Sequence, residues 1–181
     1  MGVQTSILAA GQPVGFAGMS TSKTDSISAN NAEASTNIGF GLGVKPGTTS
    51  RAALLPTASG SVLLGVVLNN MTYSPGDFGS IDQDGTPPGL IPDTLMEVIR
   101  QGRVFVVVDA DAAVTPNVTR LFWRFESDGA SNTLVGTFRH VDDTHVVDTR
   151  GQVLAVGPIF TAADGTTKIC EVYIDAVNSP T

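Results

Sequence analysis

Glycine alternates with large apolar residues between residues 36 and 44, where the chain reads TNIGFGLGV. Successive side chains of a strand point to opposite faces, so this pattern predicts a strand with one apolar face and one bare face. The apolar face holds Ile38, Phe40, Leu42 and Val44, and the bare face holds Gly39, Gly41 and Gly43. A bare glycine face lets another backbone approach closely. The segment therefore favours docking to another chain over catalysis.

The 35 residues at the start of the chain are predominantly small and polar. Ser, Thr, Ala, Gly or Asn occupies 21 of these positions. Such a segment has too little apolar surface to offset the entropy lost when it becomes ordered alone. We predict an extended N-terminal arm over residues 1–35 and a β domain over residues 36–181. The few apolar anchors of the arm are Ile7, Leu8, Phe16 and Met19.

The rest of the chain is typical of an all-β protein. Continuous apolar runs at 62–68 and 103–109 predict buried strands, and alternating segments at 120–126 and 169–174 predict strands with one buried face. Weaker strands are expected at 134–138 and 152–156. Pro-Gly and Asp-Gly pairs between these segments favour turns. The predicted fold is a single domain of the β-sandwich or β-barrel-like type, such as a jelly roll or tulip fold.

For two segments the sequence pattern does not decide between alternatives. Residues 92–100 (PDTLMEVIR) are compatible with a short helix capped by Asp93, although we favour a strand that ends at Arg100. Residues 73–93 form the longest predicted loop and contain four of the ten prolines. Long ordered loops are commonly functional, so this loop is a candidate for contact with a partner protein or with an external ligand.

Charge and composition exclude several classes of partner. The formal net charge of −7 opposes binding to nucleic acid, and the basic residues are scattered singly. No apolar run reaches the roughly 20 residues of a membrane span. The single cysteine, Cys170, alternates with Val172 and Ile174, so we expect a buried thiol and no intramolecular disulfide.

Residues that could support chemistry form no recognisable site. His140 and His145 flank Asp142 and Asp143, and the sequence IDQDGT at 81–86 contains part of a calcium loop without its remaining carboxylates. Solvated acidic loops and Asp-Gly turns explain both segments. We therefore predict no catalytic residue, no cofactor and no metal site, and the protein is not expected to be an enzyme.

The chain resembles the structural cement proteins of tailed bacteriophages over most of its length. The similar segments are GFAGM at 15–19, IGFGL at 38–42, LPTASG at 55–60, LGV at 64–66, GRVFVVV at 102–108, and VTP at 114–116 with Val118. None of these motifs is catalytic, and their order and spacing carry the resemblance. It implies a β-rich virion protein on the outer surface of the capsid, assembled in the cytoplasm of the bacterial host.

The resemblance also implies two kinds of partner, the major capsid protein and further copies of the chain. A homotrimer is favoured because the resemblance includes trimeric members and because the bare glycine face could pack near a symmetry axis, and a dimer is the alternative. The predicted interaction residues are Ile7, Leu8, Phe16, Met19, Ile27, Gly39, Gly41, Gly43 and Pro56. Two other functions remain open: a receptor-binding or glycan-binding module that uses the 73–93 loop, and a metal enzyme or hydrolase that uses the histidine and aspartate residues at 140–145.

Overall fold

The structure is a computed structural model, and it describes residues 15–34, 36–69, 89–129, 132–161 and 167–177. These residues form twelve strands and no helix, so the described chain has no helix that could cross a membrane. The strands are β1 Ser20–Asn31, β2 Ile38–Gly39, β3 Gly43–Pro46, β4 Ala52–Leu54, β5 Gly65–Val67, β6 Gly89–Leu90, β7 Leu95–Val108, β8 Phe122–Arg124, β9 Phe138–Arg139, β10 Val146–Asp148, β11 Val153–Thr161 and β12 Lys168–Asp175. The prediction of an all-β single domain is confirmed.

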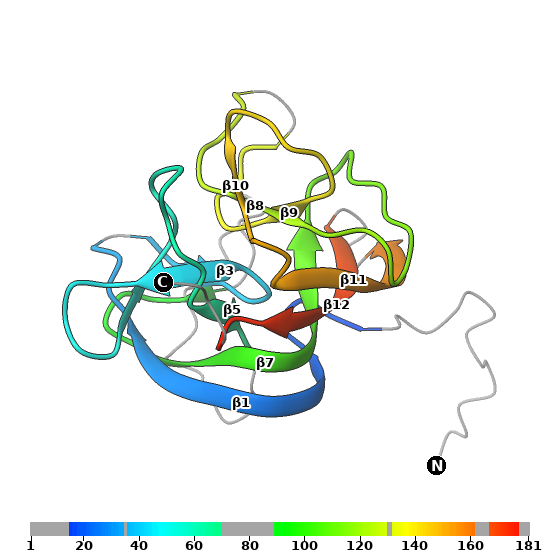
Figure 1. Ribbon diagram of the computed structural model, residues 1–181. Helices are drawn as coiled ribbons and strands as arrows, with labels where there is room; N and C mark the ends of the chain where they lie inside the picture. The colour runs from blue at the N-terminus through cyan, green and yellow to red at the C-terminus, as the bar shows by residue number, and fades with distance from the viewer. Residues whose placement is uncertain (1–14, 35, 70–88, 130–131, 162–166, 178–181) are drawn as a thin grey trace, which may run out of the picture.

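Strand β7 organises the main sheet of ten strands (Figure 1). It pairs antiparallel with β1, β5 and β12 and parallel with β9. Strand β1 also pairs with β4, β4 with β3, and β3 with β5. These pairings close a ring of five strands, β1, β4, β3, β5 and β7. The barrel-like element of the prediction corresponds to this ring.

Two apolar clusters fill the domain. One takes side chains from every strand of the ring, together with Ile38, Phe40 and Leu90, so it forms the interior of the ring. The other lies where the second half of β7 packs with β5, β8, β9, β11 and β12. Its largest side chains include Trp123 and Phe138, both at most 1% exposed. Because β7 contributes to both clusters, it joins the two parts of the core.

Most predicted strands are present, although several are shorter than their apolar patterns. Strand β5 lies within 62–68 and β8 within 120–126, while β12 covers 169–174 completely. Cys170, Val172 and Ile174 are all buried, as predicted. Burial, helped by the charge of Glu171, raises the pKa of Cys170 to about 11, so its thiol remains protonated at ordinary pH. Both observations agree with a core role for this residue.

The N-terminal boundary of the domain differs from the prediction. Ser20–Asn31 is not an arm but strand β1, which pairs with β7 from Ser20 to Asn30. The domain therefore begins at least 16 residues before the predicted start at 36. An apolar pattern does not reveal strand β1, because its residues are mostly polar and few of them are buried. Backbone hydrogen bonds hold it in the sheet.

Strand β7 also differs from its prediction, because it does not end at Arg100 but continues to Val108. Gly102 makes this continuation possible. Its φ of 139° is a conformation that L side chains rarely adopt, and an added Cβ would lie 2.1 Å from the backbone oxygen of Ser22. The β1–β7 register shifts beside this point, between Lys23 and Asp25. The paired strands bend together in this region (Figure 1).

We expect Gly102→Ala to destabilise the domain by about 3 kcal/mol or more, because the methyl group would force β1 away from β7. Urea unfolding followed by tryptophan fluorescence measures the change. Gly60→Ala is the matched control, because a Cβ at Gly60 would meet no atom within 4 Å. Equal stability of the two variants would contradict the role given to Gly102.

Candidate functional site

The segment before β1 packs directly against β7. The N–H of Gly18 donates to the oxygen of Phe105 at 2.8 Å, and the N–H of Phe105 donates to the oxygen of Met19 at 2.9 Å. Gly15 lies against the Phe105 ring so closely that an added Cβ would sit 2.6 Å from it. The chain from Gly15 to Met19 is therefore anchored to the domain.

The predicted interaction residues differ in how exposed they are in the structure. Phe16 is 42% exposed and projects from the anchored segment. Met19 and Ile27 are half-buried, and Pro56 is buried. Ile7 and Leu8 lie outside the described residues. Of the predicted anchors that the structure describes, Phe16 is the one with a large exposed apolar surface.

The prediction of a bare glycine face for another subunit is wrong, because the three glycines are buried within their own chain. An added Cβ at Gly43 would lie 2.4 Å from Nε1 of Trp123, and one at Gly41 would lie 2.9 Å from the backbone nitrogen of Gly18. Residues 36–44 also form two strands separated by a turn at 40–41, not one strand. The close approach that glycine permits does occur, but its partners are intramolecular.

A buried ion pair lies near the ends of β7 and β8. The guanidinium of Arg124 donates to the carboxylate of Asp109 through Nε at 3.0 Å and through a terminal nitrogen at 2.5 Å. The Thr137 hydroxyl donates to the other carboxylate oxygen at 2.5 Å. Both charged side chains are at most 1% exposed. Burial alone lowers the pKa of Arg124, but the hydrogen bond and charge of Asp109 outweigh burial and raise it, so Arg124 stays protonated.

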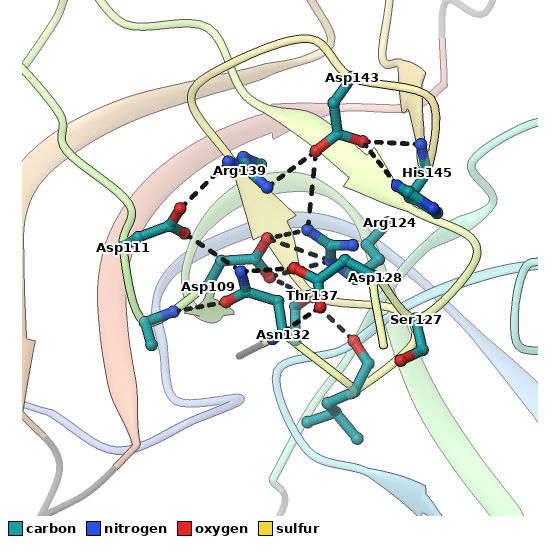
Figure 2. A network of polar contacts seen from close by, with 12 residues as sticks. Asp109, Asp111, Arg124, Ser127, Asp128, Asn132, Thr137, Arg139, Asp143 and His145 are labelled. Carbon is teal, nitrogen blue, oxygen red and sulfur yellow. Dashed lines mark hydrogen bonds and ion pairs between the residues drawn. The ribbon is translucent and has the colours of Figure 1, made fainter. Parts of the chain in front are cut away.

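The polar network extends outward from this pair to the surface (Figure 2). Asp143 lies 3.9 Å from Arg124 and accepts a hydrogen bond from Arg139 at 2.8 Å. Arg139 also pairs with Asp111 at 3.0 Å. Asn132 accepts from the N–H of Ala110 and donates to the carboxylate of Asp128. The network thus connects the turn after β7 with the segments on both sides of β9.

Two of the candidate metal ligands at 140–145 make other contacts. The Asp143 carboxylate accepts from Arg139 and from the backbone N–H of His145, at 2.8 and 2.6 Å. Nδ1 of His140 accepts instead from the N–H of Ala113, and Asp142 is exposed. Among the described residues no three His, Cys, Asp or Glu side chains are placed to hold a metal ion. The residues at 140–145 are thus arranged to order a loop.

Sequence reasoning missed Arg124. Its alternating segment predicts an outward-facing arginine, but the side chain is completely buried. Its buried partner Asp109 lies 15 positions earlier, and nothing in the local pattern indicates the pairing. The 73–93 loop lies largely outside the described residues.

We expect Arg124→Met to lower the free energy of unfolding by about 3–5 kcal/mol, because the Asp109 carboxylate would stay buried without its cation. Arg139→Met is the matched control: this arginine also makes two ion pairs, but they are partly exposed, and its loss should cost about 1 kcal/mol or less. Chemical denaturation of both variants measures the difference. A loss at Arg124 no larger than that at Arg139 would contradict this account.

The described part of the chain thus has a segment before β1 that is anchored to β7, and polar clusters that connect loops of the domain. No match was found among the curated proteins. The structural cement protein family (E217 gp24/Pam3 gp6) matches residues 3–175 of the 181. The chain therefore belongs to this family of structural phage proteins, and it is a virion protein that stabilises the capsid.

Proposed function

We propose that this protein binds the outer surface of the expanded capsid and cements neighbouring major capsid subunits against the pressure of the packaged DNA. The residues before β1 make the principal contact. Extended arms of this kind add backbone hydrogen bonds and a few apolar anchors to a partner, and repetition over a symmetric shell strengthens weak single contacts.

The charge of the chain supports the outer surface over the inner one. Seventeen acidic and ten basic residues give a net charge of −7. Such a protein is repelled by the phosphate backbone of packaged DNA. A position outside the shell keeps the acidic protein away from the negatively charged DNA. Assembly of the virion in the cytoplasm of the bacterial host is part of the same proposal.

The observation that carries the proposed contact is the anchored segment Gly15–Met19. Its backbone is bonded to Phe105, while the Phe16 side chain is 42% exposed beside it. This arrangement fixes the beginning of the described chain against β7. Ile7 and Leu8 are the anchors proposed for that preceding part, and Phe16 is the anchor at its base.

Self-association into a trimer or dimer remains part of the proposal, with the trimer favoured by the family resemblance. The glycine face no longer supports it, because Gly39, Gly41 and Gly43 are buried inside the chain. Any contact between copies must use other surfaces.

We expect removal of residues 1–14 to reduce capsid occupancy at least tenfold and to leave the melting temperature nearly unchanged, because the truncation retains Gly15 and all of β1. Occupancy is measured by mixing the protein with expanded capsids that lack it and sedimenting the complex. Removal of residues 1–35 would be uninformative, because it deletes β1 from the ring.

Phe16→Ala should also weaken binding, and Leu95→Ala is its matched control. Leu95 is 55% exposed at the far end of the β1–β7 pair, where it lies beside Asn30. Unchanged occupancy after truncation at Gly15 would overturn the arm as the main contact, whereas equal losses from Phe16→Ala and Leu95→Ala would overturn the specific role of Phe16.

A further inference from the structure

Strand β1 is paired along one edge and open along most of the other. One edge pairs with β7 from Ser20 to Asn30 (Figure 1). The other edge pairs with β4, but only at Asn30 and Asn31. Among the described residues, no further backbone group bonds to this second edge between Ser20 and Ala29. Most of this twelve-residue strand therefore has one edge without a strand partner in the described part of the chain.

Two serines of β1 direct their backbone groups to the open edge. The N–H of Asn31 donates to the residue just before β7, whereas the N–H of Asn30 donates to the residue just before β4. Backbone groups alternate between the two edges of a strand, and the β1–β7 register is regular from Ser26 to Asn30. The N–H and C=O groups of Ser26 and Ser28 therefore point the same way as those of Asn30, to the edge along which β4 does not extend.

This part of the edge lacks the features that protect edge strands. Natural edges are commonly protected by proline, by charged side chains or by bulges. The register shifts of β1 all lie before Ser26, and its two charged residues are Lys23 and Asp25. The stretch from Ser26 to Ala29 has no charge, no proline and no shift. Its backbone can therefore accept a further strand.

The exposure of Ile27 also indicates that the wall of the ring is incomplete here. The side chains of Ile27 and Ala29 both pack in the apolar cluster of the ring. Ala29 is completely buried, but Ile27 is only half-buried. Strand β4 pairs with β1 from Asn30 onward and does not reach Ile27. A strand added beside Ser26 and Ser28 would lie next to Ile27 and cover its remaining apolar surface.

The geometry of the edge favours an extended segment over a second copy of the domain. Two copies related by a two-fold axis would pair their β1 edges antiparallel. Beyond Ser28, however, β4 already occupies the line beside β1. The β1 strand of the second copy would continue into that line and meet β4. An extended segment that ends there meets no such obstacle.

We propose that the open edge of β1 at Ser26 and Ser28 accepts an extended, uncharged segment of the major capsid protein as an added strand. Such a segment binds through backbone hydrogen bonds, and a β-branched side chain on its inner face would cover Ile27. The inference rests on the proposed function. The edge is continuous with the contact proposed there, because β1 directly follows the anchored segment Gly15–Met19. At this edge the domain accepts a strand, whereas the arm is contributed to the partner.

Ser28→Pro in the full-length chain removes one outward N–H from the edge. The domain should fold with a melting temperature close to that of the wild type, because this N–H makes no bond to β7 and proline is tolerated at such edge positions. We expect the apparent Kd for expanded capsids to rise about tenfold. Ser28→Ala is the matched control, because it keeps the N–H and removes only the hydroxyl, and its Kd should stay within about twofold of the wild type.

Hydrogen exchange of the wild-type protein tests the same edge without a variant. The amides of Ser26 and Ser28 have no described partner in the free domain, so they should exchange rapidly. On reconstituted capsids their exchange should slow by about tenfold or more, which mass spectrometry of fragments from β1 measures. Unchanged exchange of these amides on the capsid would overturn the inference, even if Ser28→Pro failed to fold.

The remaining outcomes separate this inference from the proposed function. Binding by Ser28→Pro within about twofold of the wild type would overturn the added strand and leave the proposed function standing. Equal losses from Ser28→Pro and Ser28→Ala would also overturn it, since the hydroxyl would then be the contact. A dimer in light scattering that Ser28→Pro dissociates would assign the edge to a second copy and overturn the capsid segment. Absence of wild-type binding to the capsid would overturn both proposals.

Discussion

The backbone pairing of β7 is the constraint on which the rest of this structure depends. The fourteen residues of this strand pair with β1, β5, β9 and β12, and the same strand supplies side chains to both apolar clusters. A strand that pairs along both edges has no unsatisfied backbone to expose, which makes it a stable centre for a domain without helices in its described part. Gly102 lets this strand bend, so that its side chains reach both clusters.

The strands with an apolar buried face could be predicted from the sequence, whereas β1, which buries few side chains, could not. Alternation at Cys170, Val172 and Ile174 identifies β12 because one of its faces lies in the core. Strand β1 gives no such signal, since its side chains are mostly polar, few of them are buried, and its partner β7 lies about 70 residues away. Composition identified a polar segment correctly but could not show that backbone bonds order it.

The same distinction explains the errors at the candidate site. Glycine in alternate positions does indicate close approach, but only the fold shows that Trp123 and Gly18 are the groups that approach. Arg124 has a local pattern typical of an exposed residue, and its burial depends on Asp109, which an intervening loop brings into contact. Long-range pairing determines each of these features.

Membership of the structural cement protein family gives these features a common purpose. A protein that reinforces a shell needs a domain that resists deformation and contacts that repeat over the lattice. The ring, the buried ion pair and the anchored N-terminal segment meet the first need. Under the proposed function, the N-terminal arm meets the second.

Cryo-electron microscopy of expanded capsids reconstituted with the full-length protein tests the central claim most directly. The account predicts density for the β domain on the outer surface, at repeating symmetry positions, with the chain before Gly15 continuing onto major capsid subunits. Density on the inner surface, or a β domain whose N-terminal chain contacts no neighbouring capsid subunit, would contradict it.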